Sequence, residues 1–217
     1  MQIIKQLEAE IKELFHKENS GHDLYHLKRT LNLALTLQEK EGGDKTIIAV
    51  AAFLHDLHRV MQAQLGKYVS PKESLPQVRE LLDKVELTEQ QKEKILHCIE
   101  FHEEYNFTDE GKTVQDIETL IVQDADNLEA IGAIGIARAF MFAGAKKVPM
   151  WIPEVPFNQN VFNEEVLDPS EVHHFYTKLL KLKDNMNTDT AKQMAIVRTE
   201  FMELFLKEFF NEWEGKK

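Results

Sequence analysis

Hydrophobic and polar positions alternate along most of the chain with the period of amphipathic helices. Apolar residues recur three and four positions apart, which places them on one face of an α-helix. The pattern predicts helices over residues 3–17, 23–41, 45–62, about 74–84, 89–103, 115–142, 170–186 and 190–213, with the 115–142 stretch divided near Gly132 and Gly135. No segment has the pattern of a convincing β-hairpin. The predicted fold class is therefore all-α.

Polar residues that can cap a helix stand before several of these segments, namely Asp44, Ser74 with Gln77, Thr88 with Gln91, and Asp168-Pro169 with Glu171. Side chains of this kind accept hydrogen bonds from the first free N–H groups of a helix. Residues 144–168 contain no such pattern and are rich in proline. We interpret them as a long irregular segment, a type of connection that often has a function.

Length and composition are those of one globular domain spanning residues 1–217, because 43% of the residues are hydrophobic and 29% are charged. The longest apolar runs, such as residues 47–54, are far shorter than the roughly 18 residues of a membrane span. The charged, helical N-terminus is unlike a secretory signal, and the single Cys98 fits a reducing compartment. We therefore expect a cytoplasmic protein without a membrane partner, either a monomer or a homodimer.

The net charge of −11 argues against binding to a nucleic-acid polymer, which usually requires a basic surface. It does not argue against a small anionic substrate, since only the local field at a binding site matters for such a ligand.

Histidines are concentrated near the start of the chain. His22 and His26 are four residues apart, and His55 and His58 are three apart, so each pair lies on one face of a predicted helix. Asp56 follows His55 directly after the apolar run AVAAFL. Burying a carboxylate there is costly unless a cation or several donors meet it.

A second apolar segment, LIVQDADNLEAIG, leads in the same way to Asp124 and Asp126. Imidazoles and carboxylates from separate helices make a mixed nitrogen and oxygen ligand set, which suits Mn²⁺, Mg²⁺, Fe²⁺, Co²⁺ or Ni²⁺. Cys98 alone cannot form a cysteine-rich structural zinc site. The sequence therefore predicts a divalent metal site.

The order His26, His55-Asp56, Asp126 resembles the H…HD…D signature of the HD-domain metal-dependent phosphohydrolases. The segments GHDLYHLKRT, VQDADNLEAIGAIGIARAF and FYTKLLKLKDNMNTDTAKQMAIVRTEFMELFLKEF are similar to small bacterial members of that group, so the resemblance covers nearly the whole chain. It implies a single-domain helical HD fold, with metal-site helices at about residues 20–130 and a C-terminal helical extension at about 170–213.

The resemblance further implies that His26, His55, Asp56 and Asp126 are the metal ligands. Some relatives hydrolyse nucleoside triphosphates to a monophosphate and pyrophosphate. The implied activity is therefore that of a metal-dependent phosphohydrolase, similar to the nucleotide pyrophosphohydrolases, acting on a nucleotide or another small phosphate ester. Asp124 would lie behind Asp126, and we assign Asp124 and His58 a provisional role in proton transfer.

For the polar residues near the predicted ligands we propose roles in binding substrate phosphate or in orienting the ligands. The candidates for binding substrate phosphate are Arg59, Arg138 and Lys67, because cationic side chains bind phosphate oxygens. The candidates for orienting the ligands are His22, Asp23, Arg29 and Asn127. For Asp23 we favour simple helix capping, and Arg29 is expected to brace Asp126 or Asp56. We interpret His173 and His174 as surface residues and the phenylalanines of the last helix as core.

The chain also departs from the family pattern. Asn127 stands where an Arg is common, and the segment after Asp56 lacks the histidine that two-metal members usually place there. One metal ion is therefore favoured, although His97 and His102 leave a second one conceivable. Two alternatives to the phosphohydrolase stay open, namely a non-catalytic metal- and nucleotide-binding module and an iron-dependent HD-type oxygenase, which needs two metals.

Overall fold

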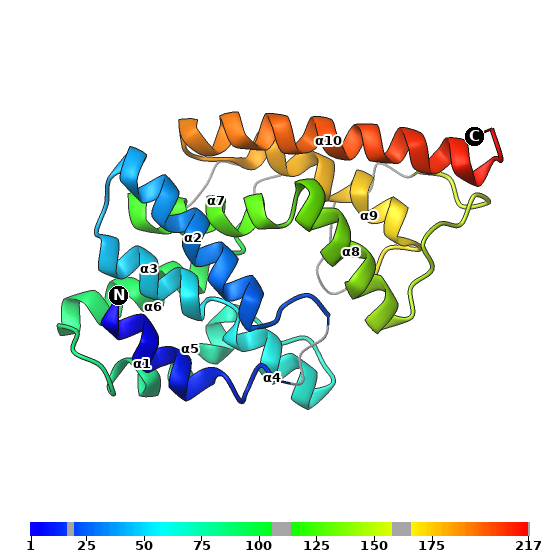
Figure 1. The fold of residues 1–217 in the computed structure, drawn as a ribbon. Helices are drawn as coiled ribbons and strands as arrows, with labels where there is room; N and C mark the ends of the chain where they lie inside the picture. The colour runs from blue at the N-terminus through cyan, green and yellow to red at the C-terminus, as the bar shows by residue number, and fades with distance from the viewer. Residues whose placement is uncertain (17–19, 106–113, 158–165, 217) are drawn as a thin grey trace.

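A computed structural model describes residues 1–16, 20–105, 114–157 and 166–216. All regular elements within these ranges are helices, which confirms the all-α prediction (Figure 1). They are α1 (Gln2–Ile11), α2 (Leu24–Glu41), α3 (Lys45–Leu54), α4 (Leu57–Leu65), α5 (Pro71–Leu82), α6 (Glu89–Phe101), α7 (Ile117–Glu129), α8 (Gly132–Lys146), α9 (Glu171–Thr177), the 3₁₀ helix η1 (Leu179–Asn185) and α10 (Asp189–Trp213).

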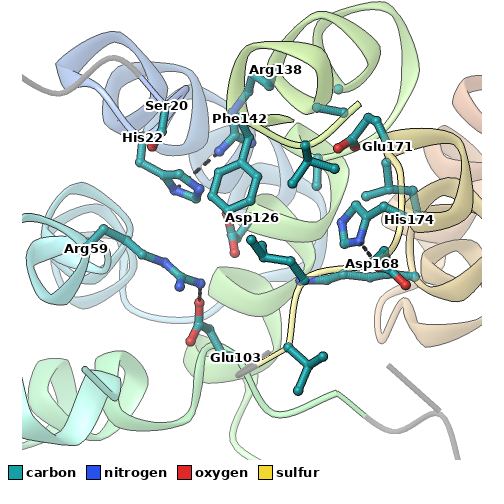
Figure 2. Close-up of a pocket in the computed structure, with 18 of the residues that line it drawn as sticks. Ser20, His22, Arg59, Glu103, Asp126, Arg138, Phe142, Asp168, Glu171 and His174 are labelled. Atoms are coloured by element: carbon teal, nitrogen blue, oxygen red, sulfur yellow. Dashed lines mark hydrogen bonds and ion pairs between the residues drawn. The ribbon is translucent and has the colours of Figure 1, made fainter. Parts of the chain in front are cut away.

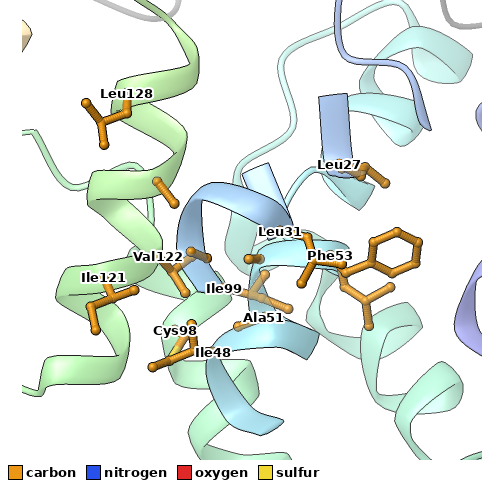
Figure 3. Close-up of a cluster of buried hydrophobic side chains, with 14 of the residues drawn as sticks. Leu27, Leu31, Ile48, Ala51, Phe53, Cys98, Ile99, Ile121, Val122 and Leu128 are labelled. Carbon is orange, nitrogen blue, oxygen red and sulfur yellow. The ribbon is translucent and has the colours of Figure 1, made fainter. Parts of the chain in front are cut away.

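Helix α3 forms the centre of the core. Every residue from Ile47 to Leu54 is buried, as expected for a helix that is apolar on all sides. Asp44 caps it by accepting hydrogen bonds from two backbone N–H groups, as the sequence predicts. Helices α2, α6 and α7 pack around α3, and Figure 3 shows their apolar side chains meeting it.

The predicted helix over residues 45–62 is wrong in one respect, because it is broken at His55 and Asp56. Helix α3 ends at Leu54 and α4 begins at Leu57. Asp56 has φ −92° and ψ 16°, a sparsely populated conformation in which active-site residues are often found. The apolar period continues across the break, so the sequence pattern alone does not reveal it.

Two predicted N-caps are also wrong. Helix α5 is capped by Ser70 with Glu73, four residues earlier than predicted, whereas Ser74 lies buried inside the helix and donates to the Pro71 carbonyl. Helix α9 is capped by Ser170, and not by Asp168. The predicted 170–186 helix is in fact α9 followed by η1.

The irregular segment predicted at 144–168 begins later, because α8 continues to Lys146. Residues 158–165 of that segment lie outside the described ranges, as does Lys17 of the predicted first helix, which ends at Ile11.

The break predicted near Gly132 and Gly135 lies between α7 and α8, where Gly132 has a φ of +80°. Among the described residues, no single helix is long and apolar enough to cross a membrane, and α7 with α8 meets that test only as a pair bent by 73°.

Helix α10 runs along one side of the molecule and packs against α7 and α8 (Figure 1). Its buried residues are Ala191, Ala195, Thr199, Met202 and Leu206. Phe205, Phe209 and Phe210 are partly buried against the core, but Phe201 is 49% exposed. The prediction that the phenylalanines of this helix belong to the core therefore holds for the others and fails for Phe201.

Candidate metal centre

The four predicted metal ligands converge at one point. Helix α2 supplies His26, the break between α3 and α4 supplies His55 and Asp56, and α7 supplies Asp126. The Nε2 atom of His26 lies 3.1 Å from Nε2 of His55 and 3.0 Å from Oδ2 of Asp56. Oδ1 of Asp126 lies 3.5 Å from Nε2 of His55 and 3.7 Å from Nε2 of His26.

The outer nitrogens of both histidines have partners that fix the tautomer. Nδ1 of His55 donates to the Ala52 carbonyl at 2.9 Å, and Nδ1 of His26 donates to Oε2 of Glu129 at 3.1 Å. In its neutral form each imidazole therefore turns the lone pair of its Nε2 toward the other predicted ligands, which is the arrangement that metal-bound histidines adopt.

These four side chains suit a divalent cation. Each carboxylate lies 3.0–3.7 Å from both Nε2 atoms, and lone pairs and carboxylates this close repel one another unless positive charge lies among them. Donors bound about 2.1 Å from one ion at right angles are about 3.0 Å apart, so the spacing matches a common ion. Both the residue types and their separations fit the metal that the family implies.

The charge balance leads to the same conclusion. Burial acts against charge on every group here, yet His55 and His22 hold the pKa of Asp56 well below its usual value. The pKa of Asp126 is also lowered, mainly by its hydrogen bond to His55. Burial opposes protonation of His55, but the two carboxylates raise its pKa to about 9. The carboxylates thus attract a positive charge into this position.

Glu129 is a supporting residue that the sequence analysis did not single out as a site residue. Besides accepting from His26, it accepts from Nε of Arg29 at 2.6 Å and from Nη1 of Arg138. Its signal in the sequence is its position three residues after Asp126, which places both carboxylates on one face of α7. The prediction that Arg29 braces Asp126 or Asp56 is wrong, because Arg29 contacts Glu129 instead.

The other predicted orienting residues have separate roles. Asp23 caps α2 by accepting from the backbone N–H of His26 at 2.8 Å, which confirms the capping interpretation. His22 donates to Oδ2 of Asp56 at 2.6 Å and so holds that carboxylate, and not His26 as expected. Burial lowers the pKa of His22 to about 4. Asn127 is buried on α7 and does not line the adjoining cavity.

A cavity that is open to solvent adjoins the ligand group (Figure 2), and about 1040 Å³ of empty space, open solvent included, lies in it. Asp126 connects the two, since it is both a predicted ligand and part of the cavity lining, with 16% of its side chain exposed. Arg59 and Arg138 also line the cavity. Lys67 is exposed beyond the end of α4 and is not among the lining residues, so the structure does not bring it to the site.

Asp124 is not placed for proton transfer. Its carboxylate accepts from the backbone N–H and the side-chain amide of Asn187, at 2.7 and 2.9 Å. It also accepts from the backbone N–H and the hydroxyl of Thr188, each at 2.8 Å. Because Thr188 is the N-cap of α10, Asp124 attaches that helix to α7. The catalytic role predicted for Asp124 is therefore wrong.

A second group of metal-ligating side chains shares Asp56 with the first. Asp56, His58, His102 and Glu103 offer atoms that all lie within 4.8 Å of one another. His58 is fully buried, and its Nε2 lies 3.5 Å from Oε1 of Glu103. This group already contains a cation, because the Arg59 guanidinium donates to Glu103 and its Nε lies 3.7 Å from Asp56.

His97 does not belong to this second group. It is exposed on α6, where it lies 3.1 Å from a carboxylate oxygen of Asp116.

The structure also places His173 and His174, which the sequence analysis interpreted as surface residues. His173 is buried between Ser170 and the Val155 carbonyl, so its interpretation as a surface residue is wrong. His174 lines the cavity, and its Nδ1 donates to Oδ2 of Asp168 at 2.8 Å. Glu171 lies beside this pair and is only 3% exposed.

Known proteins are similar to this chain over nearly its full length. The sequence profile of the HD domain matches residues 23–131. The Bacillus subtilis protein YpgQ, described as uncharacterized, is 36% identical over 214 residues, which are 97% of this chain and 94% of that protein.

Solved structures agree with the sequence matches. An HD-superfamily hydrolase from Bacillus thuringiensis is 38% identical, with a TM-score of 0.71 and coverage of 97% of this chain and 96% of that one. The structure of YpgQ in complex with ADP gives 31% identity and a TM-score of 0.71, with 97% and 95% of the two chains covered. The chain therefore belongs to the HD-domain family.

Proposed function

We propose that the protein is a metal-dependent phosphohydrolase acting on a nucleotide or a similar small phosphate ester. One observation supports this most strongly, namely that the ligand group opens to a cavity at Asp126, and Arg59 lines the same cavity. Catalytic metal sites keep one side accessible to water and substrate, whereas structural sites are closed. The ADP bound in the YpgQ structure supports a nucleotide as the ligand class.

Four side chains hold the metal in this proposal, namely His26, His55, Asp56 and Asp126. A divalent ion held there lowers the pKa of a bound water and polarises a phosphoryl oxygen. Asp56 is fixed by His22, and His26 is fixed by Glu129, so these ligands are preset and need no reorganisation when substrate arrives.

The substrate phosphate is bound on the cavity side. Arg59 is the residue we assign to it, because its guanidinium lines the cavity and is 18% exposed. Arg138 lines the cavity too, but it donates to Glu129 and to the Gly21 carbonyl, which fits a role in holding Glu129. His58 does not line the cavity, so proton transfer to it would pass through Glu103, which does.

A single metal ion per chain is part of the proposal. In the second ligand group Arg59 already supplies positive charge, whereas no lysine or arginine lies within ion-pair distance of Asp126 among the described residues. The iron-dependent oxygenase would require a metal ion in each of the two ligand groups. Elemental analysis of protein purified without chelator should give about one metal per chain, and two per chain would favour the oxygenase.

The proposed activity is tested by screening nucleotides and other phosphate esters for release of phosphate or pyrophosphate in the presence of Mn²⁺. We expect turnover by the wild type, and loss of both metal and activity in His55→Ala. His97→Ala is the matched control, since it removes an exposed histidine outside the site. Tight nucleotide binding without turnover across the panel would favour the non-catalytic binding module.

A further inference from the structure

The side of the cavity opposite Arg59 and His22 contains a carboxyl group that the proposed chemistry does not use. Figure 2 shows Glu171 there, with its carboxyl group pointing into the cavity toward the side of Phe142. The residue is 3% exposed, and its Oε1 makes no hydrogen bond within the part of the chain that the structure describes. A buried oxygen without a hydrogen-bond partner destabilises a protein, so the position of this one in a cavity points to a ligand that pairs with it.

The walls around Glu171 are suited to a flat, largely apolar group. The apolar side chains that line the cavity with it include Phe142, Val148, Val166, Leu167 and Leu179. Pockets for small molecules commonly combine such walls with a few polar groups that fix orientation. A nucleotide whose phosphates lie at Asp126 and Arg59 would extend its base into this region.

We propose that Glu171 is a specificity-determining residue that hydrogen-bonds the edge of an adenine base with its neutral carboxyl group. This inference rests on the proposed nucleotide substrate. A neutral carboxyl group has one O–H donor beside one carbonyl acceptor. The edge of adenine offers the complement, a ring nitrogen that accepts and an amino group that donates.

Adenine is favoured over guanine because its edge has only these two polar groups, and both are paired by Glu171. Guanine has three polar groups on the corresponding edge, a carbonyl, a ring N–H and an amino group, so Glu171 would leave one of them unpaired. Leaving a polar group unpaired in a buried site strongly disfavours a ligand. We expect ADP to bind about tenfold more tightly than GDP.

The surroundings of Glu171 keep its carboxyl group neutral near pH 7. Burial and the nearby Asp168 carboxylate raise the pKa of Glu171 to about 8. The other charged groups around it have partners of their own, because His174 pairs with Asp168, Lys178 donates to the Tyr105 hydroxyl, and Arg138 donates to Glu129. Above pH 8 the ionised carboxylate would accept two hydrogen bonds and would favour the adjacent N–H donors of guanine instead.

The test is the ratio of dissociation constants for the α,β-methylene analogues of ADP and GDP, measured by calorimetry on Mn²⁺-loaded protein between pH 6.5 and 9. Both ligands carry the same phosphates, so titration at the metal centre cancels in the ratio. In the wild type the adenine preference should be about tenfold at pH 6.5 and should fall as the pH rises through 8. Glu171→Gln, which keeps one donor and one acceptor, should hold the preference constant, and Glu171→Leu should abolish it.

Glu154→Gln is the matched control, because Glu154 is exposed and does not line the cavity. It should behave like the wild type. Equal affinity for both analogues at every pH, or an adenine preference that survives in Glu171→Leu, would overturn the assignment of Glu171 while leaving the phosphohydrolase proposal intact. Failure of both analogues to bind would overturn the nucleotide proposal and the assignment together. A melting curve for each variant verifies that it is folded.

Discussion

At the scale of single residues, the centre depends on carboxylates that hold the ligands as much as on the ligands themselves. Glu129 accepts a hydrogen bond from Nδ1 of His26 and is itself held by Arg29 and Arg138. The proposed ligands could be selected from the sequence because they stand in a recognisable motif. Glu129 could have been noticed from its spacing to Asp126, but Glu171 could not, because only the fold brings it to the cavity.

Glu129→Gln should weaken metal binding. An amide accepts less strongly than a carboxylate and can present its NH₂ group instead, so His26 loses its fixed tautomer. Loss of such a partner typically costs 10–100-fold in metal affinity, and we expect about that decrease. Competition with a metal-binding indicator dye would measure it. Glu118→Gln is the control, because Glu118 is also buried but lies in the first turn of the same helix; an equal loss there would contradict the explanation.

Glu171→Gln should change stability in a pH-dependent way. The pKa of Glu171 is raised to about 8, above its ordinary value of 4.5, so the neutral carboxyl stabilises the fold fully below pH 4.5. That contribution falls as the pH rises from 4.5 through 8, because over this range Glu171 is already ionised in the unfolded chain but still neutral in the folded protein. Chemical denaturation should find the variant more stable than the wild type at pH 9 and similar to it at pH 4.5. A stability difference that does not vary with pH would count against a neutral Glu171.

At the scale of elements, two connections position the site. The break between α3 and α4 turns His55 and Asp56 out of a continuous apolar helix, and Asp124 attaches α7 to the start of α10. The helices themselves were largely predictable from their periodicity and caps, with Asp44 and Thr88 as clear examples. The break was not, because it follows from packing between helices and leaves the hydrophobic period unchanged.

Asp124→Ala should destabilise the protein without removing its metal. The variant loses an acceptor for four donors from Asn187 and Thr188, and hydrogen bonds to a charged group contribute about 1.5–3 kcal/mol each, not additively. We expect a loss of about 2–4 kcal/mol in the free energy of unfolding, measured in urea. The metal content of the folded fraction should equal that of the wild type. Loss of metal from fully folded protein would contradict this explanation and would indicate that Asp124 belongs to the metal site.

At the scale of the whole molecule, the metal centre contributes only part of the net charge of −11. Four carboxylates meet around the centre, from Asp56, Glu103, Asp126 and Glu129, and the nearby guanidinium groups are those of Arg29, Arg59 and Arg138. With the histidines in their neutral form, the net charge of these groups is negative. A bound divalent cation reverses it, which allows an anionic phosphate to approach.

Metal binding should therefore stabilise the whole fold. A ligand that binds only the folded state adds about 2.7 kcal/mol at 100 times its dissociation constant. Scanning calorimetry should show a higher melting temperature with Mn²⁺ than with a chelator. His55→Ala should melt at one temperature under both conditions, and a wild-type-sized shift in that variant would mean that the ion binds elsewhere.

The central claim, that the metal centre directs water to phosphorus, is tested most directly by running the reaction in ¹⁸O-labelled water. The products of a hydrolysed nucleotide would be analysed by ³¹P NMR, in which ¹⁸O shifts the signal of the phosphorus that bears it. We predict that Mn²⁺-loaded wild-type protein places one solvent oxygen on a product phosphoryl group, and that His55→Ala forms no product. Turnover that leaves every phosphoryl group unlabelled, or equal turnover by His55→Ala, would contradict this account.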